Sequence, residues 1–174
     1  YDSLTVIKGP QTVLWGPGAS AGTVRFQRET PRFDEPGLRA QASVLGGSFG
    51  RNDQLFDITA GAPTGYARVS ANRSQAGDYA DGNGARVPSA WKKWNTDAAL
   101  GWTPDADTLL EVSAGIGNGQ ARYAGRGMDG AQFRRDSLGL RFEKAFDGRW
   151  RKLTASAYRN DADHVMDNYT LRDP

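Results

Sequence analysis

The sequence predicts an all-β chain of antiparallel strands. From Leu38 onward, apolar and polar residues alternate, and this period of two places one set of side chains on each face of a sheet. The alternation is clearest over 38–44, 56–60, 67–71, 94–102, 110–116, 138–142 and 153–157, which gives about seven strands. Short connections rich in Gly, Pro and Asp lie between several of these runs, so we expect hairpins between consecutive strands.

The lengths of the connections suggest that this sheet crosses a membrane. Turns of about five residues are expected at 61–65, 103–107 and 145–148, and longer polar loops at 73–93, at 117–134 and from Asn160 onward. Alternation of short turns and long loops is typical of a transmembrane β-barrel, where one rim faces the periplasm and the other the exterior.

The side-chain chemistry agrees with this interpretation. The polar face carries many Arg, Asp, Glu and Asn residues, which suit a wet lumen. Trp94, Trp102, Phe142 and Trp150 lie near predicted strand ends, where aromatic girdles meet the membrane interfaces. A soluble antiparallel sandwich also alternates, and strand pattern alone favours it; the connection lengths, the charged face and the aromatic positions favour the barrel.

Composition excludes several other classes of protein. The 174 residues include 22 basic and 20 acidic side chains, so the net charge of +2 is too balanced for a nucleic-acid-binding surface. The sequence has no cysteine, and therefore no disulfide and no thiolate metal site. It has no run of 18 apolar residues, which excludes a transmembrane helix.

The first 28 residues form a separate turn unit. Apolar runs at Leu4–Ile7 and Thr23–Phe26 predict two strands, and the Gly- and Pro-rich centre between them leaves room for at most one helical turn at Gln11–Leu14. A phosphate-binding loop is the competing interpretation. The glycine spacing matches neither the dinucleotide-binding pattern nor the P-loop, and a strand follows where both motifs need a helix.

Three short motifs in this unit carry a family resemblance. Lys8-Gly9-Pro10, Trp15-Gly16 and Gly22-Thr23-Val24 follow one another as they do at the end of the plug domain in TonB-dependent outer-membrane receptors. The whole string from Trp15 to Phe26 resembles most the copper receptors of that family.

The resemblance implies a domain organisation. Residues 1–29 would be the C-terminal part of a plug domain, and the proline-interrupted segment 30–37 would be the plug-barrel linker. Residues 38–174 would be the first seven or so strands of a barrel of about 22 strands. Because the chain starts without Met and ends within an apolar-aromatic run, we expect it to be a segment of a larger protein. With two open sheet edges, the isolated segment should not fold stably in water.

His164 and Met166 are the candidate metal ligands. In an extended chain, residues two apart point to the same side, so an imidazole and a thioether would be presented together, a pair that suits soft Cu(I). Strand counting places them on the long-loop, exterior side. Spacing alone favours the interpretation that they are unrelated surface residues.

The resemblance implies more for this pair. TonB-dependent copper receptors use a His-x-Met pair on a barrel loop, completed by a Cys and a Met from the plug. Since the sequence contains no Cys, that half of the site would lie before Tyr1 or be absent. Met128 is a possible extra thioether, and Asp161, Asp163 and Asp167 could help to attract cations.

The implied function is import of copper ions through the outer membrane. The expected partners are the copper ion, outer-membrane lipid and the TonB inner-membrane energy complex, whose contact would precede Tyr1. An enzyme is not expected, because Asp57, Asp97 and Glu111 lie on different predicted strands without a partner base, and Ser20 lacks a nucleophile-elbow context. The alternatives are a receptor for a siderophore or other metal chelate and a soluble β-sandwich binding module.

Overall fold

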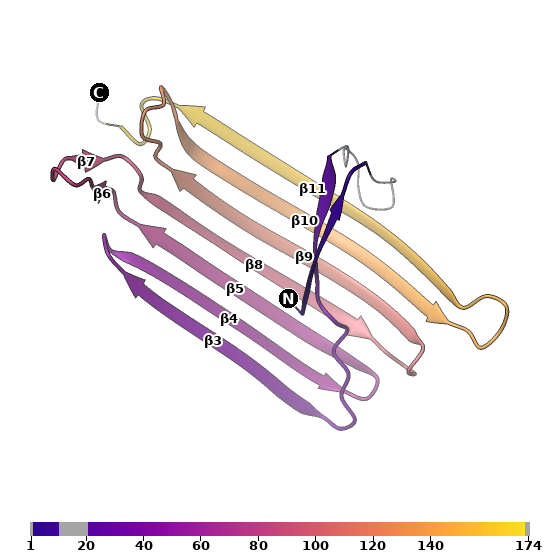
Figure 1. Ribbon diagram of the computed structural model, residues 1–174. Helices are drawn as coiled ribbons and strands as arrows, with labels where there is room; N and C mark the ends of the chain where they lie inside the picture. The colour runs from indigo at the N-terminus through magenta and orange to yellow at the C-terminus, as the bar shows by residue number, and fades with distance from the viewer. Residues whose placement is uncertain (1, 11–20, 173–174) are drawn as a thin grey trace. The chain divides into compact units, whose positions relative to one another are not determined.

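The computed structural model describes residues 2–10 and 21–172 (Figure 1). The chain forms two compact units, Tyr1–Pro31 and Arg32–Pro174, and we describe each separately. The helical turn expected at Gln11–Leu14 and the Trp15-Gly16 motif lie outside the described residues. The assignment of 1–29 to a plug, 30–37 to a linker and 38–174 to a barrel stays a prediction.

The first unit is an antiparallel hairpin. Strand β1 (Ser3–Lys8) pairs with β2 (Gly22–Gln27), with Val6 opposite Val24. Both predicted strands are therefore confirmed. Gly22 is required where the second strand begins, because its φ is +152° and a Cβ there would lie 2.7 Å from the carbonyl oxygen of Ile7.

The second unit is one seven-stranded antiparallel sheet in which each strand pairs with its neighbours in the order β11-β10-β9-β8-β5-β4-β3 (Figure 1). Its strands are β3 (Gly37–Gly47), β4 (Arg51–Ala62), β5 (Gly65–Ala76), β8 (Trp91–Trp102), β9 (Thr108–Ala121), β10 (Asp129–Ala145) and β11 (Lys152–Asp167). The connection between β5 and β8 contains a small hairpin, whose strands β6 (Tyr79–Ala80) and β7 (Arg86–Val87) have two residues each. Each predicted strand lies within one of the seven.

The strands are longer than the sequence pattern indicated. Strand β9 continues to Ala121 and β10 starts at Asp129, so only 122–128 remain of the loop expected at 117–134. Strand β11 likewise continues to Asp167, where a loop was expected from Asn160. The prediction was wrong here because polar residues predominate on both faces of these stretches. Hydrophobic alternation disappears while the backbone hydrogen bonds of the ladder continue.

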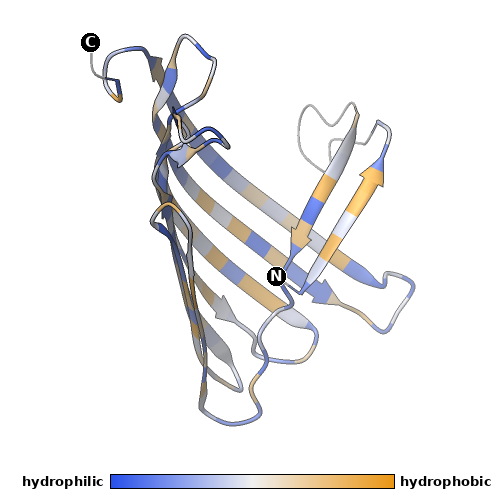
Figure 2. Cartoon of the chain, turned by 60° about the vertical axis from the view of Figure 1, so that its left-hand side comes forward, coloured by the Kyte–Doolittle hydropathy of each residue, from blue (hydrophilic) through white to orange (hydrophobic). Residues whose placement is uncertain are grey.

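One face of the sheet is apolar and uncovered. Cross-strand register places Leu100 of β8 opposite Ala67 and Val112, so apolar side chains form a continuous surface from strand to strand. The alternating stripes of hydropathy along the strands are visible in Figure 2. Leu100 is 66% exposed and Leu38 is 64% exposed, whereas Tyr66 and Leu109 are the only buried hydrophobic residues among those described. A β-sandwich would bury this face against a second sheet, but all the long strands belong to one sheet.

Aromatic side chains delimit the apolar face. Trp94 and Trp102 lie near opposite ends of β8 and point to this face, separated by about 27 Å along the strand at the usual rise per residue. Phe142 lies opposite Leu110, which in turn lies opposite Trp102, so these residues share one level. Trp150 lies outside the strands and is 81% exposed. No helix within 2–10 and 21–172 is long and apolar enough to cross a membrane.

The polar face is lined by paired charges. Asp57 accepts from Arg68 at 2.7 Å, Asp97 accepts from Arg135 at 2.9 Å, and the Tyr66 hydroxyl donates to Glu111. The three carboxylates considered in the sequence as catalytic candidates therefore lie on three different strands, and each has its own partner.

The connections form two rims. The turn rim consists of residues 63–64, 103–107 and 146–151, and the loop rim of 48–50, 77–90 and 122–128. The turn-rim connections have two, five and six residues, and the loop-rim connections have three, fourteen and seven. The predicted long loop is therefore confirmed at 77–90 but not at 122–128. The end of β11 lies at the loop rim (Figure 1).

Candidate metal site

His164 and Met166 lie near the C-terminal end of strand β11, at the loop rim. The chain there is extended, and both side chains belong to the same face of the sheet. In the ladder, His164 is opposite Phe133 and Met166 is opposite Gly130 of β10. The extended chain therefore presents an imidazole and a thioether on the same side, as the sequence predicted. The metal-binding role of the pair stays a prediction.

This face is the polar one. Strand β11 alternates regularly from Ser156, which lies opposite Arg141, to His164. Arg141 in turn lies opposite Glu111, whose carboxylate accepts from Tyr66 on the polar face. His164 is exposed and Met166 half-buried. The pair therefore stands at the loop-rim end of the polar face, opposite to the face that is apolar further along the strand.

The imidazole of His164 stacks on an aromatic ring. The centroids of His164 and Phe133 are 4.7 Å apart and their planes are inclined by 26°. Among the described residues, His164 makes no hydrogen bond through either ring nitrogen. The ring is therefore positioned by stacking, and both ring nitrogens remain available to bind a metal.

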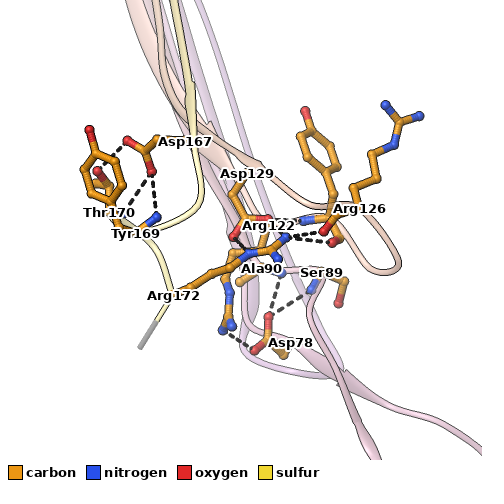
Figure 3. A network of polar contacts seen from close by, with 11 residues as sticks. Asp78, Ser89, Ala90, Arg122, Arg126, Asp129, Asp167, Tyr169, Thr170 and Arg172 are labelled. Atoms are coloured by element: carbon orange, nitrogen blue, oxygen red, sulfur yellow. Dashed lines mark hydrogen bonds and ion pairs between the residues drawn. The ribbon is translucent and has the colours of Figure 1, made fainter. Parts of the chain in front are cut away.

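A buried ion pair anchors the loop next to this site (Figure 3). The carboxylate of Asp129, which is fully buried, accepts from Arg172 at 2.7 and 2.8 Å and from the N–H of Tyr123 at 2.9 Å. Arg172 also donates to the carbonyl of Arg126 at 2.7 Å. These contacts tie the segment that follows β11 to both ends of the 122–128 loop.

This environment acidifies Asp129. The hydrogen bond from Arg172 is the main reason that the pKa of Asp129 falls to about 2. The N–H of Tyr123 lowers the pKa further, while burial opposes the shift. Asp129 is therefore ionised at any physiological pH, and its charge is neutralised within the loop rim.

A second buried carboxylate organises the neighbouring connection. Asp78 accepts from the N–H groups of Ser89 and Ala90, each at 2.9 Å, and pairs with Arg122 at 2.7 Å (Figure 3). It also pairs with Arg86 at 2.9 Å. Burial alone would raise the pKa of Asp78, but the two N–H groups and the two guanidinium groups outweigh it and lower the pKa below its ordinary value. Through Arg122, this network joins the 77–90 and 122–128 connections.

The other candidate ligands are not brought to the pair. Asp161 and Asp163 belong to the opposite face of β11, since they differ from His164 by an odd number of residues. Asp167 is occupied by Thr170 and Tyr169. Met128 is 50% exposed in the 122–128 loop. No group of three or more His, Cys, Asp or Glu side chains able to hold a metal occurs in the part of the chain that the structure describes.

Sequence reasoning missed Phe133, the β-bulge next to it, and the Asp129–Arg172 pair. Gly130, in a polar stretch with no apolar period, was the available signal for a bulge or a close approach. Arg172 lies 43 residues from Asp129, and nothing in the sequence links the two.

Comparison with known proteins bears on the whole chain. The sheet has an exposed apolar band bounded by aromatics and a face lined by ion pairs, which defines a segment of a membrane β-barrel. No family model matches the chain, and no curated protein matches it. Among solved structures, the chain is similar to one described as "Copper transporter OprC", with 61% sequence identity over 100% of this chain and a TM-score of 0.93.

This similarity confirms the family. The chain is a segment of a TonB-dependent receptor of the copper-receptor kind, and its fold is that of an antiparallel barrel fragment. It spans 28% of the length of the copper transporter that it matches.

Proposed function

We propose that the protein containing this chain imports copper through the outer membrane of a Gram-negative bacterium. The observation that carries the proposal is the match of all 174 residues to a copper transporter at 61% identity and a TM-score of 0.93. Similarity at this level preserves more than the fold, because it extends through the loops and rims where a cargo would be recognised.

The apolar face supports the location. Its exposed side chains, such as Val44 at 74% and Leu138 at 56% exposure, would be solvated by lipid chains rather than by water. Trp94 and Trp102 would lie at the two interfaces, with their rings at headgroup level. The polar face would then line the lumen, where a plug is expected.

His164 and Met166 are the proposed barrel half of the copper site. A neutral imidazole nitrogen and a thioether sulfur are ligands that Cu(I) accepts, whereas hard cations prefer oxygen. The two side chains share one face at the loop rim, which would be the side from which an external ion arrives. The resemblance implies that a Cys and a Met of the plug complete the site, from residues outside this sequence.

Energy for release would come from the TonB complex of the inner membrane. By analogy with the family, that complex would rearrange the plug so that copper bound between plug and barrel passes into the periplasm. Nothing in this step requires bond making or breaking in the cargo, so the protein would act as a transporter and not as an enzyme.

The proposal can be tested by measuring copper binding to the intact receptor. We expect His164→Ala and Met166→Ala each to weaken Cu(I) binding, with His164→Ala having the larger effect because it removes the stronger donor. Val165→Ala, between them on the opposite face, is the matched control and should bind as the wild type does. Unchanged copper stoichiometry and affinity in both ligand variants would refute the site. If the intact receptor takes up a siderophore and not copper, the alternative of a siderophore or metal-chelate receptor is favoured.

A further inference from the structure

Phe133 is the residue that holds the imidazole of His164. The two rings are stacked with centroids 4.7 Å apart, and the residues are directly opposed in the β10–β11 ladder. Within the described residues, the side chain of His164 makes no other ring contact and no hydrogen bond. Its orientation therefore depends on this neighbour more than on any other side chain that the structure describes.

A β-bulge in β10 places Gly130 beside this ring. Phe133 lies on the polar face because the regular β10–β11 ladder runs without interruption as far as Gln132 opposite Val165. Beyond that point Gly130 lies opposite Met166, so Ala131 is one extra residue on the β10 side. Without it, Gly130 would lie opposite Asp167 and belong to the other face of the sheet. The bulge thus brings Gly130 onto the face that Phe133 and His164 occupy.

Gly130 provides the space for the aromatic ring. A Cβ on Gly130 would lie 2.2 Å from two ring carbons of Phe133, closer than any real contact. The N–H of Phe133 donates to Asn118 Oδ1 at 3.3 Å, which fixes the backbone from the β9 side. The ring of Phe133 is therefore confined between a glycine backbone and the imidazole.

The arrangement suits a metal ligand. Metal-bound histidines are usually oriented by a hydrogen bond that the N–H of the second ring nitrogen donates to a neighbouring acceptor. A stacking contact does the same work from the face of the ring and leaves both nitrogens at its edge free. We propose that Phe133, seated on Gly130, is a positioning residue that orients His164 for Cu(I), an inference that rests on the proposed function.

The chain offers a matched control at the turn rim. Tyr66 lies on Gly101 in the same manner, and a Cβ on Gly101 would lie 2.1 Å from its ring. Tyr66 contacts no histidine, since its hydroxyl donates to Glu111. Substituting Gly101 should disturb the sheet about as much as substituting Gly130 while leaving the proposed metal ligands untouched.

The first measurement needs no copper. In the metal-free intact receptor, the ring-current shift of the His164 carbon-bound protons, assigned by comparison with His164→Gln, should be present in the wild type and Phe133→Tyr. It should be lost in Phe133→Leu and reduced in Gly130→Ala. An unchanged shift in Phe133→Leu would overturn the inference.

The second measurement is Cu(I) affinity by competition with a chelator. Since an aromatic pair contributes about 0.5 to 1.5 kcal/mol, we expect Phe133→Leu and Gly130→Ala to bind roughly 2- to 12-fold more weakly. Phe133→Tyr and Gly101→Ala should bind as the wild type does. Equal weakening by Gly101→Ala and Gly130→Ala would overturn the inference, because general strain would then explain both.

The two proposals fail separately. If His164→Ala binds Cu(I) with wild-type affinity, the proposed metal site is wrong. If His164→Ala loses affinity while Phe133→Leu keeps it, the metal site stands and the positioning role of Phe133 is wrong.

Discussion

The same strands have two different environments along their length. In the band, the stretch of the sheet between the levels of Trp94 and Trp102, apolar side chains alternate with polar ones. In the extensions, the loop-rim ends of β5, β8, β9, β10 and β11, polar residues predominate on both faces. The hydrogen-bonded ladder is continuous through both regions. Backbone pairing therefore sets the extent of the strands, while the surrounding solvent sets their side-chain pattern.

The largest effect that we predict tests whether the apolar side chains of the band face lipid, and it is measured on the isolated chain in water. Because the exposed apolar face has no covering layer and β3 and β11 each have one strand neighbour, we expect residues 1–174 alone to aggregate or remain unfolded in water. Refolding into detergent micelles should recover strand content, as circular dichroism would show. A soluble monomer with a cooperative urea transition would contradict the membrane interpretation and favour a soluble binding module.

A single charge should distinguish the band from the extensions. Ala98 lies midway along β8 on the apolar face, and we expect Ala98→Arg to destabilise the intact barrel in lipid by roughly 2 to 4 kcal/mol. Gln120, exposed in the β9 extension opposite Lys92, is the matched position. Gln120→Arg should cost about 0 to 1 kcal/mol because arginine there remains hydrated.

The measurement is urea unfolding of the barrel in phospholipid vesicles, with both variants compared to the wild type. Similar costs at the two positions would mean that the band and the extensions share one environment. That result would contradict the location proposed for the apolar face.

This division explains what the sequence could predict. Within the band, period-two alternation located all seven strands, and residues such as Leu100 and Val112 were placed on the correct face. In the extensions there is no hydrophobic difference between faces, so β11 was ended at Asn160 although it continues to Asp167. Tertiary pairing with β10 decides that segment, and pairing is invisible to a local pattern.

The candidate site lies in the region where prediction was weakest. His164 and Met166 were identified by residue type, spacing and resemblance, and strand counting placed them at the loop rim. Their shared face depends on an extended backbone, and the ring that His164 contacts is set by the pairing of β10 with β11, in which Phe133 lies opposite His164. The sequence does not show which residues of two polar stretches lie opposite each other, so Phe133 could be found only from the register.

The smallest effect that we predict concerns the extensions alone. Since the pKa of Asp129 is about 2 in the folded chain and 3.8 ordinarily, its ionised form contributes stability above about pH 4 that is lost as pH falls towards 2. We expect the amide of Tyr123, which donates to this carboxylate, to lose hydrogen-exchange protection over that interval in the intact receptor. Rates would be corrected for the pH dependence of intrinsic exchange.

Two comparisons make this result specific. In Asp129→Asn, protection of the Tyr123 amide should be lower at neutral pH and should no longer change between pH 4 and 2, because the titrating group is gone. The amide of Ala99, in the band portion of β8, should stay protected throughout, since its ladder bonds involve no carboxylate. If Ala99 lost protection together with Tyr123, the acid transition would belong to the whole sheet. The loop rim would then have no independent stability, and the contrast between the band and the extensions would be one of side-chain pattern only.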